Sequence, residues 1–203
     1  MIKQAFITKA INNYNITIDS NLCYYNRIGM NMTRDGIPSN PSSMVNMVVT
    51  DNTFVARLDS DEVTEFQNRV DAGIDFGTYS GNTLTRPINE TTSTLGPIVA
   101  CENGSCASFP WTSYTLATWK TFSGEDATST VGVATVPSVD SLRFEVNTTS
   151  SPVTVAFGTQ SYIDIRTGAT YSCDYSLPAF SGLVAIKSAT VSCSSVRHKG
   201  RIF

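Results

Sequence analysis

The chain has 203 residues, with 14 Lys or Arg against 17 Asp or Glu, which gives a net charge of −3 at pH 7. Proteins that bind nucleic acid neutralise phosphates with a basic surface, so this balance argues against a nucleic-acid partner. The single histidine argues against most zinc-hydrolase sites and leaves one candidate base for a Ser-His-Asp triad. Charged residues make up only 15% of the chain, against about 25% in ordinary soluble domains, and Ser, Thr and Asn supply the remaining polarity.

This length suits one substantial core, and we interpret residues 1–203 as a single domain. The N-terminus lacks the apolar stretch of a secretory signal, which favours synthesis in the cytoplasm without a signal peptide. No run of about 18 apolar residues occurs, so no membrane span is expected.

The N-terminal part of the chain gives a mixed pattern. Apolar residues within 1–14 recur at a spacing near 3.6, which predicts a short helix or N-terminal arm, with a strand as the competing interpretation. Residues 29–43 are rich in turn-forming residues. Alternating apolar and polar residues at 44–49 and 54–58, on either side of Asp51-Asn52, predict a β-hairpin.

One helix is predicted at residues 60–71. Acidic residues gather at its start, apolar residues recur on one face, and Gly73 follows its end. The next stretch, residues 77–96, is polar and rich in Gly, Thr, Asn and Pro, which predicts a long loop.

After Pro97 the chain has the pattern of short strands, separated by turn residues every 8–12 residues or so. The clearest of these strands are expected at residues 131–136, 142–146, 153–157, 162–165, 183–186 and 190–193. The pattern predicts an all-β fold, a single β-sandwich or jelly-roll-like domain with one short helix. Residues 197–203 form a basic tail, expected either to fray or to dock as an arm on a neighbouring subunit.

The five cysteines are an odd number in a chain too large to need disulfide staples. We expect five reduced and mostly buried thiols. The alternative is two disulfides, Cys173 with Cys193 across neighbouring strands and Cys101 with Cys106 around a turn. Cys101 and Cys106 could also form half of a zinc site, but no matching pair completes it, so no metal and no cofactor is expected.

The sequence gives few catalytic signals. His198 lies in the basic tail, and neither a Gly-x-Ser-x-Gly elbow nor a phosphate-binding Gly-rich loop is present. A glycosidase needs two carboxyls on facing strands, for which Glu145 and Asp164 are the available pair. We expect no catalytic residues and no enzyme activity. Trp111 and Trp119 are expected in the core, with a sugar-stacking platform as the alternative.

The low charge favours assembly. Interface cores are depleted in Lys, Glu and Asp, and closed symmetric oligomers are the common result of self-association. The leading hypothesis is therefore a non-enzymatic structural protein that forms a homo-oligomer.

Parts of the chain resemble the jelly-roll spike and minor capsid proteins of small tailless phages. The similar stretches are Ala5-Phe6-Ile7-Thr8-Lys9, Tyr162-Ile163-Asp164-Ile165-Arg166-Thr167-Gly168 and Leu183-Val184-Ala185-Ile186. The predicted helix at 60–71 lies outside them. The resemblance implies a vertex oligomer that decorates a capsid and touches the host surface. The partners expected are copies of the chain and other virion proteins, with a host-surface glycan as a further candidate.

Three functional hypotheses follow. The first is a virion structural protein, namely a spike, capsid, decoration or tail-tube subunit. The alternative is a secreted or cell-surface adhesion or glycan-binding β-sandwich module, which would be extracellular. The third is a polysaccharide-acting β-sandwich enzyme that uses Glu145 or Asp164.

Overall fold

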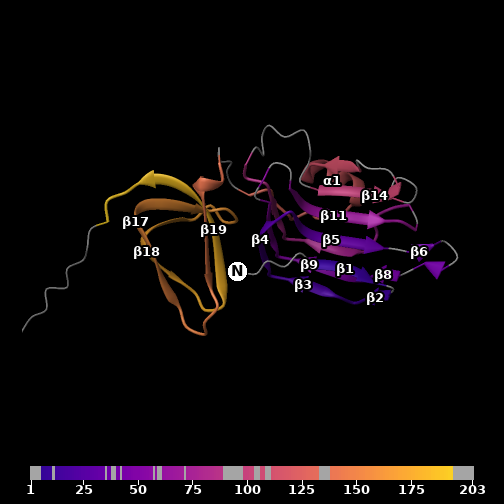
Figure 1. Cartoon of the computed structure of the whole chain (residues 1–203), viewed down its shortest axis with the longest axis horizontal. Coiled ribbons are helices and arrows are strands. Elements are labelled where there is room, and N and C mark those ends of the chain that lie inside the picture. Colours follow the sequence, from indigo (N-terminus) through magenta and orange to yellow (C-terminus); the bar gives the residue numbers. More distant parts are fainter. Residues whose placement is uncertain are drawn as a thin grey trace, which may run out of the picture. The chain divides into compact units, whose positions relative to one another are not determined.

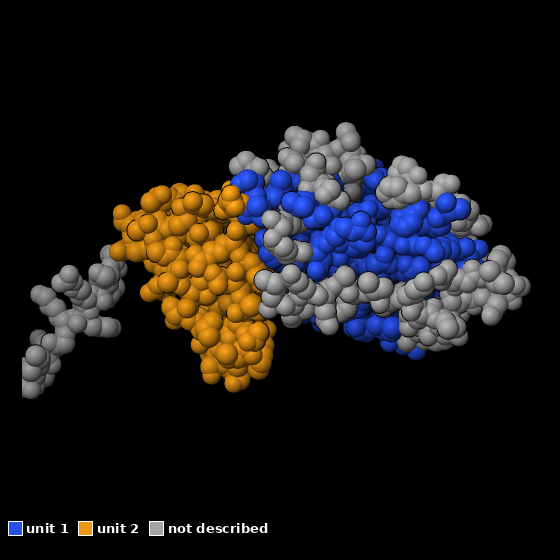
Figure 2. All heavy atoms as spheres, viewed as in Figure 1, with its two compact units in different colours: residues 1–139 blue, residues 140–203 orange. Residues whose placement is uncertain are grey.

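The structure is a computed structural model, which folds as two compact units in place of the single domain expected. Unit 1 comprises residues 1–139 and unit 2 residues 140–203 (Figure 2). The residues that the structure describes are 6–10, 12–34, 36–37, 40–41, 43–56, 58, 61–70, 72–88, 98–102, 106–107, 111–132 and 138–193.

Unit 1 is built from short strands that pair in parallel (Figure 1). In its largest sheet, β5 (Ile28–Arg34) lies between β1 (Phe6–Ala10) and β11 (Glu62–Asn68), and β11 also pairs with β14 (Ile98–Glu102). Paired residues belong to successive turns of the chain, so that Met30 lies opposite Thr64 and Thr64 opposite Ile98. The chain therefore returns to this sheet once in every turn.

Three smaller parallel sheets repeat this arrangement. Their strands are β2 (Asn12–Tyr14) with β8 (Ser43–Val45); β3 (Thr17–Asp19), β9 (Met47–Thr50) and β12 (Gly77–Ser80); and β4 (Leu22–Asn26), β10 (Thr53–Ala56) and β13 (Thr83–Thr85). Successive turns thus stack on one another, and unit 1 is a parallel β-solenoid. A short antiparallel pair, β6 (Gly36–Ile37) with β7 (Asn40–Pro41), branches from its second turn.

The sheets of unit 1 enclose one apolar core. Alternation within each strand builds this core, because successive side chains of a strand point to opposite faces. Met30 and Met32 of β5 and Phe66 of β11 enter the core, together with Met47 of β9 and Phe54 of β10. All five side chains are almost completely buried.

A column of asparagines supports one corner of the solenoid. Asn21, Asn52 and Asn82 occupy the same position in successive turns, and Asn52 bonds to both of the others. The residue before each asparagine has a positive φ: 56° at Ser20, 55° at Asp51 and 66° at Gly81. At Gly81 a Cβ would lie 2.2 Å from Asp51 Oδ1, so a larger residue there would have to displace the Asp51 side chain. The sequence carries the column as a repeated Asn, which a search for internal periodicity would find.

One end of the solenoid is capped. β15 (Thr112–Tyr114) pairs antiparallel with β14, and helix α1 (Leu116–Ser123) follows it, between the N-cap Thr115 and a left-handed Gly124. Strands were expected throughout the chain after Pro97, but residues 116–123 form a helix. Residues 125–130 then run along the last turn: Asp126 N–H donates to Tyr79 O (2.8 Å) and Thr130 N–H to Asn82 O (2.8 Å).

The helix predicted at 60–71 is a strand. Residues 62–68 form β11, which is hydrogen-bonded to β5 on one side and β14 on the other. Its side chains are buried on both faces from Val63 to Asn68, and the apolar residues Val63, Phe66 and Val70 of the segment fall at a helical spacing. The acidic residues attributed to a helix start, such as Glu62 and Glu65, have other roles, which are described below.

Three further predictions in unit 1 differ from the structure. Within 1–14, where a helix or a strand was expected, the described residues form the strands β1 and β2. The strands at 44–58 exist, but they pair with neighbouring turns and not with each other as a hairpin. The loop expected at 77–96 contains β12 and β13, and its part from 89 to 96 lies outside the described residues.

Unit 2 is a four-stranded antiparallel sheet. Its order is β16 (Leu142–Asn147), β19 (Ser181–Thr190), β17 (Val153–Asp164) and β18 (Thr170–Leu177), and a short 3-10 turn, η2 (Val139–Ser141), precedes it. These strands contain the predicted ones at 142–146, 153–157, 162–165 and 183–186, apart from Ile165. The core of unit 2 consists of Val155, Phe157, Leu177, Leu183 and Ala185.

The all-β class is confirmed, with several sheets and one short helix among the described residues. The jelly-roll variant is not confirmed. Neighbouring strands of a jelly roll run antiparallel, whereas the main ladders of unit 1 are parallel. Turn spacing and alternation report where strands lie, but they do not report the direction in which strands pair.

Candidate functional site

The cysteines form the two disulfides that the sequence offered as the alternative. Cys101 bonds to Cys106 and Cys173 to Cys193, with Cα–Cα distances of 5.0 and 5.6 Å. The expectation of five reduced thiols is therefore wrong. Cys23 is the free cysteine; it is buried, and burial raises the pKa of its thiol to about 11.

The tryptophan pair does not form a platform. Trp119 is fully buried under the cap, where its ring stacks on Phe66 with centroids 4.6 Å apart and its Nε1–H donates to Asp126 Oδ2 (3.0 Å). Trp111 is half-buried. The core interpretation of Trp119 is confirmed, and a glycan platform made by both rings is excluded.

Glu145 and Asp164 also have separate roles. The Asp164 carboxylate accepts from the Arg166 backbone N–H (2.7 Å) and the Thr167 backbone N–H (3.2 Å), which fixes the turn after β17. Glu145 is on β16 and pairs with Arg143 at 2.6 Å. β19 lies between their strands, so the two carboxyls are not on adjacent strands. His198 and the tail at 197–203 lie outside the described residues.

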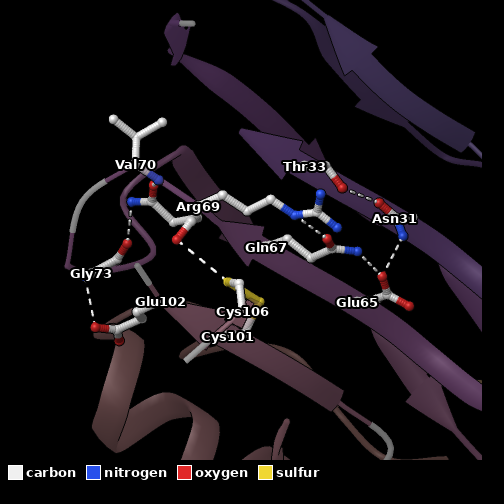
Figure 3. The surroundings of a disulfide bond; sticks show 11 residues. Asn31, Thr33, Glu65, Gln67, Arg69, Val70, Gly73, Cys101, Glu102 and Cys106 are labelled. Atoms are coloured by element: carbon white, nitrogen blue, oxygen red, sulfur yellow. Dashed lines mark hydrogen bonds between the residues drawn. A yellow bond between two sulfur atoms is a disulfide. The ribbon is translucent and has the colours of Figure 1, made fainter. Parts of the chain in front are cut away.

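A row of polar side chains crosses the outer face of the main sheet of unit 1 (Figure 3). We call Thr33, Asn31, Glu65, Gln67 and Arg69 the polar row. The Thr33 hydroxyl donates to Asn31 Oδ1 (2.7 Å), Asn31 Nδ2–H to Glu65 Oε1 (2.6 Å), and Arg69 Nε–H to Gln67 Oε1 (3.0 Å). Gln67 Nε2–H also donates to Glu65 Oε1. Glu65 is therefore the central acceptor of the row.

The register of β5 and β11 creates this row. Asn31 lies opposite Glu65 and Thr33 opposite Gln67, while the alternate residues Met30, Met32 and Phe66 enter the core. The predicted helix at residues 60–71 would not place these side chains in a row, so the row was not among the sites predicted from the sequence. Polar residues at every second position of both segments are the pattern that would have indicated it.

The disulfide of unit 1 lies at one end of this row (Figure 3). Cys106 Sγ is 3.5 Å from Asn68 O, and the Asn68 amide donates to Gly73 O (2.6 Å). The Gly73 N–H in turn donates to Glu102 Oε2 (2.9 Å). These contacts join the ends of β11 and β14, so the disulfide fastens the chain where it leaves the sheet.

Glu62 and Glu65 form a carboxyl pair at the other end of β11. Burial raises the pKa of Glu62 to about 7, together with a hydrogen bond to Glu65 and repulsion by its charge, while Arg27 acts in the opposite direction. Such a pair can hold a proton near neutral pH. Glu65 is only 5% exposed and Glu62 is half-buried, so the buried position of Glu65 suits a structural role better than contact with a substrate.

This pair predicts a pH-dependent stability. The folded state keeps the Glu62 proton up to about pH 7, whereas the unfolded chain loses it at an ordinary carboxyl pKa near 4.3. Between these values the folded state binds more protons, so the free energy of unfolding falls as pH rises. Glu62→Gln is neutral at every pH, and we expect it to flatten this part of the stability curve.

Thermal melting from pH 4 to pH 8 measures the effect. Relative to wild type, Glu62→Gln should gain stability between about pH 5 and pH 7. The control is Asp140→Asn, at an exposed carboxyl in η2, which should follow the wild-type curve. Parallel curves for wild type and Glu62→Gln would contradict the shared-proton interpretation.

Unit 2 carries a separate group of aromatic side chains. We call Phe157, Tyr162, Tyr171 and Tyr175 the aromatic cluster. Ring centroids are 5.0 Å apart for Phe157 and Tyr162, 6.3 Å for Phe157 and Tyr175, and 4.1 Å for Tyr171 and Tyr175. The Arg143 guanidinium carbon lies 4.7 Å from the Phe157 centroid and 5.2 Å from that of Tyr162. Burial and a hydrogen bond with Tyr175 raise the pKa of Tyr171.

The end of the solenoid opposite the cap has a different character. β1, β2 and β3 each have one paired neighbour among the described residues, and we call their outer sides the open edge. In β3 and its flanks, Ile16 O accepts from Val48 N–H (2.8 Å) and Ser20 N–H donates to Thr50 O (3.1 Å). Backbone groups alternate in direction along a parallel strand, so those of Thr17 and Asp19 point away from β9.

Two general observations apply to the described residues. No helix there combines the length and the apolar character that crossing a membrane requires. No set of three or more His, Cys, Asp or Glu side chains in the same residues is placed to hold a metal ion.

Comparisons of the chain with protein-family models, with curated proteins and with solved structures find no match. A proposal for its function therefore depends on the geometry described above and on the sequence.

Proposed function

We propose that the chain is a non-enzymatic structural subunit of a virion, such as a spike, capsid, decoration or tail-tube subunit. It works by assembling with copies of itself and with other virion proteins. The open edge is the observation that supports assembly most directly. The virion setting depends on the sequence resemblance.

The open edge supports assembly because unpaired backbone groups of an edge strand are a template for another chain. The cap covers the corresponding groups at the other end, where residues 125–130 bond to β12 and β13. Stacking of open edge on cap is therefore blocked. Two copies that meet edge to edge form a closed pair with two-fold symmetry.

The surface beside the open edge also suits a contact with protein. Val45 and Val48, in the second turn, are 38% and 37% exposed. They lie in register with Tyr14 and Thr17 of the first turn. Exposed apolar side chains next to unpaired backbone are features of an association surface, and the low overall charge is consistent with one.

The test removes one backbone donor from the open edge. Thr17 is exposed and its N–H points away from β9, so Thr17→Pro deletes an outward donor without breaking the ladder. We expect the wild-type protein to be an oligomer in light scattering and analytical ultracentrifugation. Thr17→Pro should shift it towards a mass of 22.0 kDa, with an apparent dissociation constant raised about tenfold or more.

Thr17→Val is the matched control, because it removes the hydroxyl and keeps the N–H. It should have the native mass of wild type, and circular dichroism should show that both variants are folded. A wild-type protein that is a monodisperse monomer at micromolar concentration would overturn the proposal. Equal masses for an oligomeric wild type and Thr17→Pro would show that the open edge is not the interface.

A further inference from the structure

We propose that unit 2 binds a neutral saccharide on the aromatic cluster, with Arg143 and Glu145 as its polar contacts. This inference goes beyond the assembly role and does not depend on it. The residues concerned come from β16, β17 and β18, and none of them belongs to unit 1.

The sheet register places the polar pair beside the rings. Arg143 lies opposite Ala185 and Glu145 opposite Leu183, and directly paired residues of antiparallel strands project from the same face. Ala185 and Leu183 belong to the same buried group as Phe157, against which the tyrosines pack. Rings, guanidinium and carboxylate therefore share one face of the sheet.

Exposure distinguishes this group from an ordinary core. Phe157 is buried, but Tyr162, Tyr171 and Tyr175 are each only partly buried. The side chains of Arg143 and Glu145 are 28% and 29% exposed. A bound molecule can therefore reach both the tyrosine rings and the ion pair, while the five-residue apolar core beneath holds them in place.

The chemistry of the group favours a sugar. The face of a pyranose ring presents C–H groups that stack on the electron-rich faces of aromatic rings. Its rim presents hydroxyls that donate to a carboxylate and accept from a guanidinium. Arg143 and Glu145 neutralise each other at 2.6 Å, so the site carries no net charge from this pair. A neutral saccharide fits this arrangement better than an anionic one.

The experiment is saturation-transfer NMR on the full chain with a panel of neutral saccharides at millimolar concentration: maltotriose, cellotriose, triacetylchitotriose, mannotriose and lactose. We expect transfer from protein aromatic protons to the ring protons of at least one sugar. Tyr171→Ala should weaken that binding about tenfold through loss of a stacking ring. Glu145→Gln, which keeps the shape of the side chain, should weaken it about threefold through loss of a charged acceptor.

Phe180→Ala is the matched control, because Phe180 is a 73% exposed aromatic residue of unit 2 outside the aromatic cluster. It should bind like wild type. Absence of transfer for every sugar in the panel would overturn the proposal. It would also be overturned if Glu145→Gln and Tyr171→Ala both bind the sugar as wild type does, provided that Tyr171→Ala is folded. If no sugar binds to the wild-type protein and Tyr171→Ala changes the native mass, the aromatic cluster is a contact with another protein chain, and the saccharide proposal is overturned. Assembly is tested by Thr17→Pro in unit 1 and sugar binding by variants in unit 2. A failure of the assembly proposal can therefore be distinguished from a failure of the saccharide proposal.

Discussion

Replacing Asn52 by alanine is expected to lower the free energy of unfolding of unit 1 by about 3–5 kcal/mol, because several buried backbone groups lose their partners at once. Asn52 is 1% exposed. Its Oδ1 accepts from Asn21 N–H (2.9 Å), and its Nδ2 donates to Ile18 O (2.8 Å) and Thr50 O (2.9 Å). Alanine offers none of these bonds and leaves no side chain to replace them.

The size of this effect follows from the position of Asn52 in the column. It is the middle member, and its side chain bonds to both Asn21 and Asn82, so its loss breaks the column of side-chain bonds at its centre. In a solenoid each turn is stabilised mainly by its neighbours. Thermal melting should show a decrease of about 10 °C in the transition of unit 1.

Asn46→Gly is the control for this prediction. Asn46 is exposed, it makes one side-chain bond to Asn15 Oδ1 (3.0 Å), and its φ of 57° is one that glycine adopts freely. Replacing the Asn46 side chain in this way should change the free energy of unfolding by less than about 1 kcal/mol. Equal effects of Asn46→Gly and Asn52→Ala would show that the buried column has no special role.

The second large effect is expected for Trp119→Ala, which should destabilise unit 1 by about 3–5 kcal/mol, as truncation of a buried aromatic residue does. Trp119 is completely buried and lies between the Phe66 ring and the Asp126 carboxylate. Asp126 also accepts from Asn82 Nδ2 (3.2 Å). The cap and the asparagine column are thus one connected structure.

Loss of Trp119 should also change association. Without it, residues 125–130 lose the support that holds them over β12 and β13, and exposed strand edges promote aggregation. Light scattering during heating should therefore show aggregation at a lower temperature than in wild type. Phe122→Ala is the control on the same helix, because Phe122 is 40% exposed, and it should cost about 1 kcal/mol or less. Equal effects of the two substitutions would contradict the assignment of Trp119 as the anchor of the cap.

The positions of most strands of unit 2 were predictable from the residue pattern. Alternation in Leu142–Asn147 and Ser181–Thr190 reports local geometry, because successive side chains of a strand project to opposite faces. The all-β class follows from the same property. The two cysteine pairs were also recognisable as an alternative, since their places on a turn and on neighbouring strands permit a disulfide.

The pairing of the strands in unit 1, and the residues that this pairing brings together, depend on contacts between distant parts of the chain. Asn31 and Glu65 meet because one turn of the solenoid separates them, and a local pattern holds no information about that distance along the chain. The segment at 60–71 shows the same limit. Its apolar spacing fits a helix, but hydrogen bonds from β5 on one side and β14 on the other make it a strand, because packing between turns outweighs local propensity.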